Sequence, residues 1–486
     1  MSKQNIVGKV LYIALIINWA SIGTAQNPVS SVQQKITAWK DVPGLSTASV
    51  GMAVSDPATG EVLLKSEPPQ SLAPASILKL VTTATALEVF GPDYRFQTTM
   101  TASGEVRNDT LLGDLQIIGG GDPTLGSAYF PENNHFMEDW IKALKDKNIK
   151  VVSGNLVLDA TIYEAQTIPN TWIWEDIGNY YGAGASGISV YDNMYEIHLS
   201  SGKEVGKTTH IGKINPEIPG LELHNEVLSS DINSDEAYVF GSPMEYRRVI
   251  RGTIPKNKSD FVIKASIPDP SALLASEFRK VLLKNGIQII GTTRYEKAKR
   301  MNGLPVIKSV NQSPPLREII KVTNHESVNL FAEHFLKQLA LNTSGVGSTK
   351  DGCKFIENFW KNKGIDMTGF FMNDGSGLSR FNAVTALQMV NVLNYMKINS
   401  TWSNDFVESL ATVGEGTLTA LRNENFPDHC LRAKSGSMTR VRCFAGYLTT
   451  DSKRMLTYCF MLNDFSCSQS EATNKIEEVL VALRKL

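Results

Sequence analysis

The segment Ser76-Ile77-Leu78-Lys79 combines a hydroxyl and an amine at a spacing that suits a nucleophile and its base. Pro74 precedes it and a helical pattern follows, so both side chains lie on one helical face, one turn apart. Burial favours a neutral amine, which can take the hydroxyl proton. A second copy, Ser200 to Lys203, follows a predicted strand and contains a glycine, so its side chains need not face each other. The alternative for Ser76 is a helix N-cap beside a solvated lysine.

Two further polar side chains, Ser327 and Asn329, stand at the start of another predicted helix. The pattern S-x-N is weak by itself, because two other copies occur in the chain. This copy follows Asn324 and precedes an apolar-periodic stretch over residues 330–339. A short loop there would direct both side chains into a cleft. The alternative is that Ser327 only caps the helix.

A third polar group, Lys434-Ser435-Gly436-Ser437, ends a predicted strand just before a turn. A cation and a hydroxyl at a strand edge can bind a substrate carboxylate, and Gly436 allows a ligand to approach the backbone closely. The N–H groups of Ser437 and Ser76 could together form an oxyanion hole. The alternative is a simple hairpin turn.

The elements that must position these groups come from both ends of the chain. Strands are predicted over residues 48–55, 61–65, 431–437, 442–450 and 454–462, and helices over 30–40, 75–90 and 470–486. We expect the two ends to complete one antiparallel sheet with helices on its face. The stretch between them is too long for a loop and is rich in short strands, so we expect one or two inserted domains.

The composition excludes several classes of function. The chain has 486 residues, 42% of them hydrophobic and 20% charged, as in an ordinary soluble protein. It has 48 basic and 49 acidic residues, a balance that argues against a nucleic-acid partner. The seven histidines are scattered and no C-x-x-C or H-E-x-x-H occurs, so we expect no metal or other cofactor.

Residues 1–25 are typical of a secretory signal. Lys3 and Lys9 give a basic start, an apolar run follows from Val10 to Ala20, and small residues lead to Ala25. We therefore expect cleavage before residue 26, export to the periplasm or an equivalent compartment, and no stable membrane span afterwards. The alternative is an uncleaved anchor, for which the apolar run is short.

Five cysteines remain, an odd number that leaves at least one thiol without a partner in the same chain. If the predicted strands 442–450 and 454–462 pair, Cys443 and Cys459 come near a diagonal. A disulfide between them is one alternative, but we expect buried thiols.

The order S-x-x-K, S-x-N, K-S-G resembles that of the penicillin-binding proteins and serine β-lactamases. The long separation of Lys79 from Ser327 resembles in particular the D-alanyl-D-alanine carboxypeptidase/endopeptidase family, the low-molecular-mass class C penicillin-binding proteins. Other stretches similar to that family are residues 119–125, 180–183, 192–193, 374–380 and 414–418. One departure is that the family usually has K-T-G-T where this chain has K-S-G-S, which puts the rate and the β-lactam affinity in doubt.

The resemblance implies an α+β fold. A penicillin-binding/β-lactamase-like transpeptidase domain, an antiparallel five-stranded sheet flanked by helices, would comprise residues 26–91 and 309–486. Residues 92–308 would form a large, mainly β insert of two small domains. The implied function is a serine-type D-Ala-D-Ala carboxypeptidase that acts on peptidoglycan stem peptides through an acyl-enzyme and reacts covalently with β-lactam antibiotics. A D-Ala–diaminopimelate endopeptidase activity stays open.

The resemblance also implies the roles of individual residues. Ser76 would be the nucleophile and Lys79 its base, Ser327 and Lys434 would relay or tune protons, and Asn329 would bind the substrate amide.

Around these catalytic groups, Lys434 and Ser435 would hold the terminal carboxylate, with Gly436 and Ser437 beside the substrate. Asp159 would bind the amino end of the diaminopimelate side chain, unless it only caps a turn. Two other functions remain open: a β-lactamase or esterase on the same fold, and a binding protein that holds peptidoglycan without cleaving it.

Overall fold

The structure is a computed structural model that describes residues 28–486 except 67–68, 103 and 300–304. The predicted export signal at residues 1–25 lies outside the described residues. Among the helices of the described residues, none is both long and apolar enough to cross a lipid bilayer.

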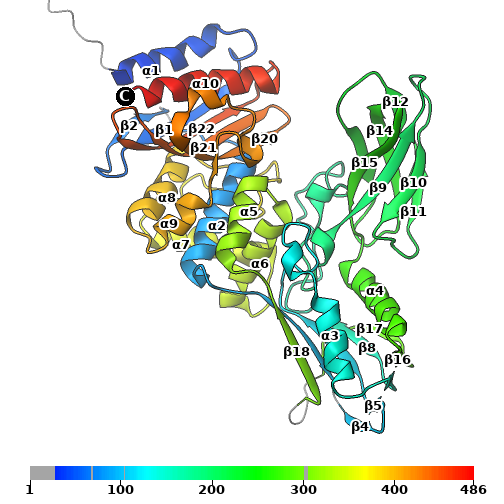
Figure 1. Ribbon diagram of the computed structural model, residues 1–486. Coiled ribbons are helices and arrows are strands. Elements are labelled where there is room, and N and C mark those ends of the chain that lie inside the picture. The colour runs from blue at the N-terminus through cyan, green and yellow to red at the C-terminus, as the bar shows by residue number, and fades with distance from the viewer. Residues whose placement is uncertain (1–27, 67–68, 103, 300–304) are drawn as a thin grey trace, which may run out of the picture.

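The two ends of the chain form one antiparallel sheet, as predicted (Figure 1). Its strands are β1 (Ser49–Ser55), β2 (Val62–Lys65), β19 (Ala411–Thr412), β20 (Leu431–Met438), β21 (Val441–Thr449) and β22 (Met455–Asn463). Their order is β19-β20-β21-β22-β1-β2. The sheet therefore contains the five predicted strands and one more, the two-residue edge strand β19. The first and last strands pair over seven residues of β1, which unites the two ends of the chain.

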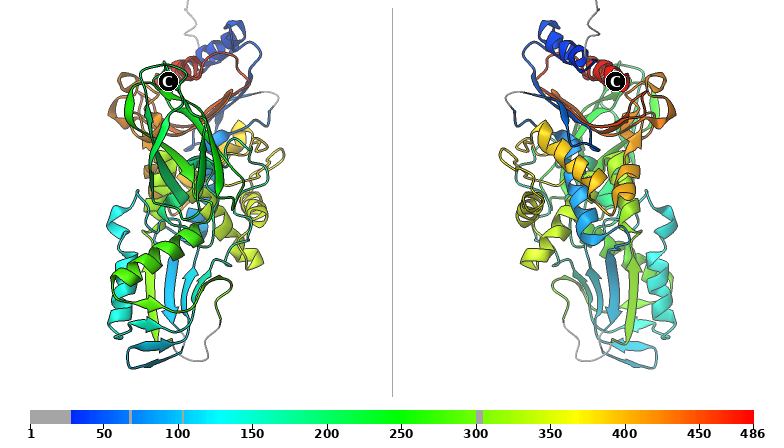
Figure 2. Two further views of the ribbon diagram at one scale, coloured as in Figure 1. Left: turned by 90° about the vertical axis from the view of Figure 1, so that its right-hand side faces the viewer. Right: turned by 90° about the vertical axis from the view of Figure 1, so that its left-hand side faces the viewer.

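Helices cover both faces of this sheet, as the side views in Figure 2 show. Those of the sheet domain are α1 (Pro28–Thr37), α2 (Lys79–Phe90), α5 (Leu316–Glu326), α6 (Asn329–Ser344), α7 (Thr349–Asn362), α8 (Ala386–Ile398), α9 (Ser403–Glu408) and α10 (Gln469–Arg484). The terminal helices α1 and α10 pack together on one face. On the other face α2 is buried on nearly all sides among its neighbours, which explains its run of apolar and small residues.

The inserted region leaves the sheet domain after α2 and builds separate sheets. One has the order β17-β8-β6-β3-β18 and another β16-β7-β5-β4. Their strands are β3 (Gln97–Ala102), β4 (Glu105–Arg107), β5 (Thr110–Leu112), β6 (Leu115–Gly119), β7 (Val151–Val152), β8 (Leu156–Asp159), β16 (Gln288–Ile289), β17 (Thr293–Tyr295) and β18 (Ile307–Gln312). The boundary predicted at residue 308 falls inside β18, which pairs with β3 along its whole length.

Between these strands the chain forms a second lobe, drawn in green in Figure 1. It contains β9 (Met194–Ser201), β10 (His210–Asn215), β11 (Glu222–Asn225), β12 (Leu228–Ser230), β13 (Glu236–Phe240), β14 (Arg247–Pro255) and β15 (Lys258–Ser266). Two helices, α3 (Phe136–Lys145) and α4 (Pro270–Lys284), pack beside the first set of sheets. One hydrophobic core runs through both parts of the insert.

All five cysteines are free thiols in the described residues. Cys443 on β21 and Cys459 on β22 lie on paired strands two positions out of register, the predicted diagonal, and both are fully buried. Burial raises the pKa of Cys443 to about 12, so this thiol stays protonated near neutral pH.

We predict that a thiol reagent finds five free thiols in unreduced protein after denaturation. In the folded protein the half-buried Cys430 and Cys467 should react first, because Cys353, Cys443 and Cys459 are shielded. Replacing both half-buried cysteines by serine should remove the fast phase. A count of three thiols would instead indicate a disulfide.

Candidate active site

Ser76 and Lys79 face each other at the start of α2. Ser76 lies in a 3₁₀ turn, η2 (Ala75–Leu78), that runs directly into the helix. The side-chain nitrogen of Lys79, Nζ, lies 3.0 Å from Ser76 Oγ. Ala75, just before the serine, has φ +47°, a conformation that a residue with a Cβ adopts only when its surroundings enforce it. The turn therefore directs the Ser76 hydroxyl at the Lys79 side chain.

Lys79 is fully buried, and this sets its protonation. Loss of hydration lowers its pKa to about 7, although the carboxylates of Asp374 and Glu333 act in the opposite direction. Besides Ser76, its Nζ donates to Asn329 Oδ1 at 2.6 Å and to the Ser376 carbonyl at 2.8 Å. Near neutral pH a large fraction of this amine is neutral and can accept a proton.

Ser327 and Asn329 lie at the junction of α5 and α6. Ser327 ends α5 in the left-handed conformation, with φ +61°, and Val328 rather than Ser327 holds the N-cap position of α6. Both Ser327 and Asn329 line the same cavity as Ser76. Asn329 also donates from Nδ2 to the Tyr181 carbonyl at 2.8 Å, so it joins α6 to the insert.

Strand β20 carries the third motif past the nucleophile. A Cβ on Gly436 would lie 2.7 Å from the Pro74 carbonyl oxygen and 3.1 Å from the Ser76 nitrogen, so only glycine fits there. Ser437 lines the cavity beside Ser76. Ser435 is buried and donates to the Thr417 carbonyl at 3.3 Å, within the predicted family stretch 414–418.

Lys434, on the same strand, is fully buried and is not among the residues that line the cavity. Its Nζ donates to the Ser435 carbonyl at 2.8 Å. Burial, with the positive charge of Lys79 nearby, holds its pKa well below the usual value. Burial thus lowers the pKa of both lysines of the motifs, Lys79 and Lys434.

The cavity measures about 470 Å³ and has walls from both parts of the chain. The sheet domain contributes Ser76, Ser327 and Ser437, while the insert contributes Asp176 and Tyr181. Arg380 also lines the cavity and lies near Asp176. Burial raises the pKa of Asp176, although the charge of Arg380 and a hydrogen bond from Tyr181 lower it. An acid and a guanidinium close together can bind a ligand that carries both an amine and a carboxylate.

Asp159 does not lie among the residues that line this cavity. One of its carboxylate oxygens accepts from the N–H and hydroxyl of Thr161, and the other from the N–H of Ala298. This is the turn-capping alternative that the sequence left open. Asp176, which sequence analysis did not single out, does line the cavity.

Two buried acids behind Lys79 were also missed. Asp374 and Glu333 are almost inaccessible to solvent, and their oxygens accept several backbone N–H groups of the loop 374–379. That loop was noticed only as a stretch similar to a known family. Within the described residues, no group of three or more His, Cys, Asp or Glu side chains could hold a metal ion.

A serine hydroxyl 3.0 Å from the amine of a fully buried lysine, at a cavity that Ser327, Asn329 and Ser437 also line, is an arrangement that suits acyl transfer. Residues 32–486 match the D-Ala-D-Ala carboxypeptidase 3 (S13) family, so the chain belongs to this family. It is a serine-type D-Ala-D-Ala carboxypeptidase.

Individual relatives agree with this assignment. The chain is 28% identical over 440 residues to the D-alanyl-D-alanine carboxypeptidase of Actinomadura sp. strain R39, covering 86% of this chain and 79% of the relative. Its fold is similar to that of penicillin binding protein 4 from Haemophilus influenzae, with a TM-score of 0.78, 22% identity, and coverage of 94% and 99% of the two chains. A second structure of that protein, complexed with a β-lactam, gives a TM-score of 0.73 at 21% identity over 94% and 98%.

We predict that kcat/KM for D-Ala release rises as pH increases through about 7, because Lys79 accepts a proton only when neutral. Rates measured across neutral pH on a D-Ala-D-Ala peptide would test this. Lys79→Arg should be inactive at every pH, because a guanidinium does not lose its proton. A flat profile through neutral pH would contradict the assignment of Lys79 as the base.

Proposed function

We propose that the enzyme trims peptidoglycan stem peptides by a Ser76 acyl-enzyme, with Lys79 as general base. The observation that carries this proposal is the 3.0 Å contact between Ser76 Oγ and a Lys79 amine that is wholly buried. Ser76 attacks the carbonyl carbon of the penultimate D-Ala while its proton passes to Lys79. The N–H groups of Ser76 and Ser437 stabilise the oxyanion that forms.

The leaving group departs from the other side of the same intermediate. The C–N bond breaks, and the amine of the terminal D-Ala receives a proton from Lys79 by way of Ser327, which lines the cavity. Asn329 holds the substrate amide, and the buried Lys434, with Ser435, attracts the terminal carboxylate. Water then hydrolyses the ester and returns Ser76 to its free form.

The same chemistry extends to a cross-link. The bond between D-Ala and diaminopimelate also lies beside a free carboxylate, so an endopeptidase activity at this site needs no further group. Within the cavity, Asp176 and Arg380 are suited to the amine and carboxylate at the end of a diaminopimelate side chain. This replaces the role that the sequence suggested for Asp159.

The proposal places the enzyme outside the cytoplasm, since its substrate is there. Support comes from the basic start, apolar run and small residues of positions 1–25. β-Lactams are expected to acylate Ser76, as the β-lactam complex of the Haemophilus influenzae protein suggests by similarity of fold. A β-lactamase would differ by releasing the acyl group quickly, and a pure binding protein by never forming it.

We predict that penicillin adds its mass to one serine, Ser76, in the intact protein. Ser76→Ala should abolish both the adduct and D-Ala release, whereas Ser200→Ala should leave both unchanged, because Ser200 is a β9 residue of the insert. Mass spectrometry after incubation with penicillin measures the adduct. An adduct on the Ser76→Ala protein would refute the nucleophile, and rapid loss of the wild-type adduct would favour the β-lactamase.

We predict further that Asp176→Asn lowers kcat/KM by about tenfold or more for a diaminopimelate-containing peptide with a free side-chain amine, because a charge-assisted hydrogen bond is lost. Acylation by penicillin, which carries no such amine, should change little. Asp159→Asn is the matched control and should affect neither reaction selectively. Equal loss of both activities in Asp176→Asn would show that the residue supports the fold instead.

A further inference from the structure

The loop 374–379 contacts Lys79 and the residue that precedes Ser76. Its Ser376 carbonyl accepts a hydrogen bond from Lys79 Nζ at 2.8 Å. Gly377, with φ +85°, packs directly against the carbonyl of Ala75, the residue before the nucleophile. Thr82, on the next turn of α2 after Lys79, donates to the Gly375 carbonyl at 2.7 Å. The position of this loop therefore fixes one of the three acceptors around the Lys79 amine.

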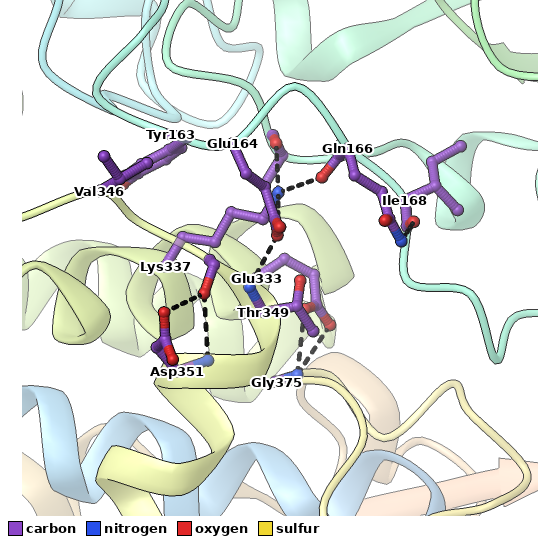
Figure 3. Close-up of polar contacts among 12 residues, drawn as sticks. Tyr163, Glu164, Gln166, Ile168, Glu333, Lys337, Val346, Thr349, Asp351 and Gly375 are labelled. Carbon is purple, nitrogen blue, oxygen red and sulfur yellow. Dashed lines mark hydrogen bonds and ion pairs between the residues drawn. The ribbon is translucent and has the colours of Figure 1, made fainter. Parts of the chain in front are cut away.

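Glu333 holds the loop from α6. It lies one helical turn after Asn329, on the same face, and only 1% of it is exposed. Its carboxylate accepts the N–H of Gly375 at 3.0 Å and that of Ser376 at 2.8 Å. Figure 3 shows this carboxylate directed at Gly375. Glu333 accepts the N–H of Ser376 while Lys79 donates to its C=O, so the backbone of Ser376 is fixed from both sides.

We propose that Glu333 is a positioning residue for the proton transfer: it directs the Ser376 carbonyl at Lys79, and its negative charge stabilises the ammonium that Lys79 forms when it takes the proton of Ser76. The inference rests on the proposed function, in which Lys79 is the general base.

The charged groups around this pair are few and all lie close by. Lys79 faces the carboxylates of Glu333 and Asp374, both of which raise its pKa. Lys434 also lies nearby, and burial together with the charge of Lys79 lowers the pKa of Lys434. Glu333 in turn faces Asp374, and burial together with that charge raises the pKa of Glu333, although the N–H groups of Gly375 and Ser376 favour its ionised form.

Two titratable groups face Glu333 from its other sides. One is Cys353 on α7, whose buried thiol has a pKa well above its usual value and stays neutral. The other is Lys337, one turn further along α6. Lys337 donates to the Gln166 carbonyl at 2.7 Å and lies 3.4 Å from Glu164, so its charge is balanced on the side of the insert (Figure 3). The charge of Glu333 is thus directed mainly to the loop and Lys79.

The test is the pH dependence of penicillin acylation in the full chain with Glu333→Gln. Glutamine keeps the size of the side chain and an acceptor oxygen but removes the charge. Without that charge the Lys79 ammonium is less stable, so the acid limb should move to lower pH by about one unit. The plateau rate should fall, on the order of tenfold, because the amine is a weaker base.

The matched control is Glu477→Gln. Glu477 is equally buried but lies on α10, across the sheet from the site, where it binds Arg422 and Asn425. Its substitution should leave the midpoint and the plateau in place. A purely structural role of Glu333 would reduce the fraction of protein that can be acylated without moving the midpoint, and an unchanged midpoint in folded Glu333→Gln would overturn the proposal.

A second variant covers the case in which Glu333→Gln does not fold, as judged by circular dichroism. Glu333→Asp keeps the charge but withdraws it from the loop by one methylene, so the plateau rate should fall with little change in the midpoint. A wild-type plateau in this variant would overturn the proposal. Failure of the wild-type protein to be acylated at all would instead refute the proposed function, which keeps the two failures distinct.

Discussion

The structure depends on keeping one lysine amine out of water beside a serine hydroxyl. Moving the Lys79 pKa from its ordinary value of 10.5 to about 7 corresponds to a free-energy penalty of about 5 kcal/mol on the ammonium form. The amine is held in place by hydrogen bonds to Ser76, Asn329 and Ser376. Since Asn329 and Ser376 are distant from Lys79 in the sequence, α6 and the loop 374–379 must pack against α2 before the amine has these partners.

The insert helps to hold α6, the helix of Asn329, in place. Helix α6 carries buried polar side chains that would otherwise face water, and segments of the insert satisfy them. His334 contacts Gly121 and Ser189, while Gln338 accepts from Tyr163. Lys337 binds Gln166 in the same way. The insert therefore covers α6 on one side and, through residues 175–181, lines the cavity beside Ser76 on the other.

Much of this architecture was visible in local sequence patterns. Alternation of apolar residues and turn chemistry predicted β1, β20, β21 and β22 nearly to their ends, because strands and turns are specified by neighbouring residues. The edge strand β19 has only two residues and carries no such pattern. The expected end of the insert, residue 308, lies inside β18, whose pairing with β3 links residues about two hundred positions apart and has no local pattern.

The sequence by itself determined that Ser76 and Lys79 meet: they lie one helical turn apart, and a single helical segment suffices to bring them together. It also determined the order of the three motifs and the glycine that lets β20 pass the nucleophile. Only the tertiary structure decided which acids matter. Asp159 and Asp176 look alike in sequence, yet one caps a turn and the other lines the cavity. Glu333 and Lys79 meet the same loop because long-range packing removes both from water, and burial of this kind has no local signature.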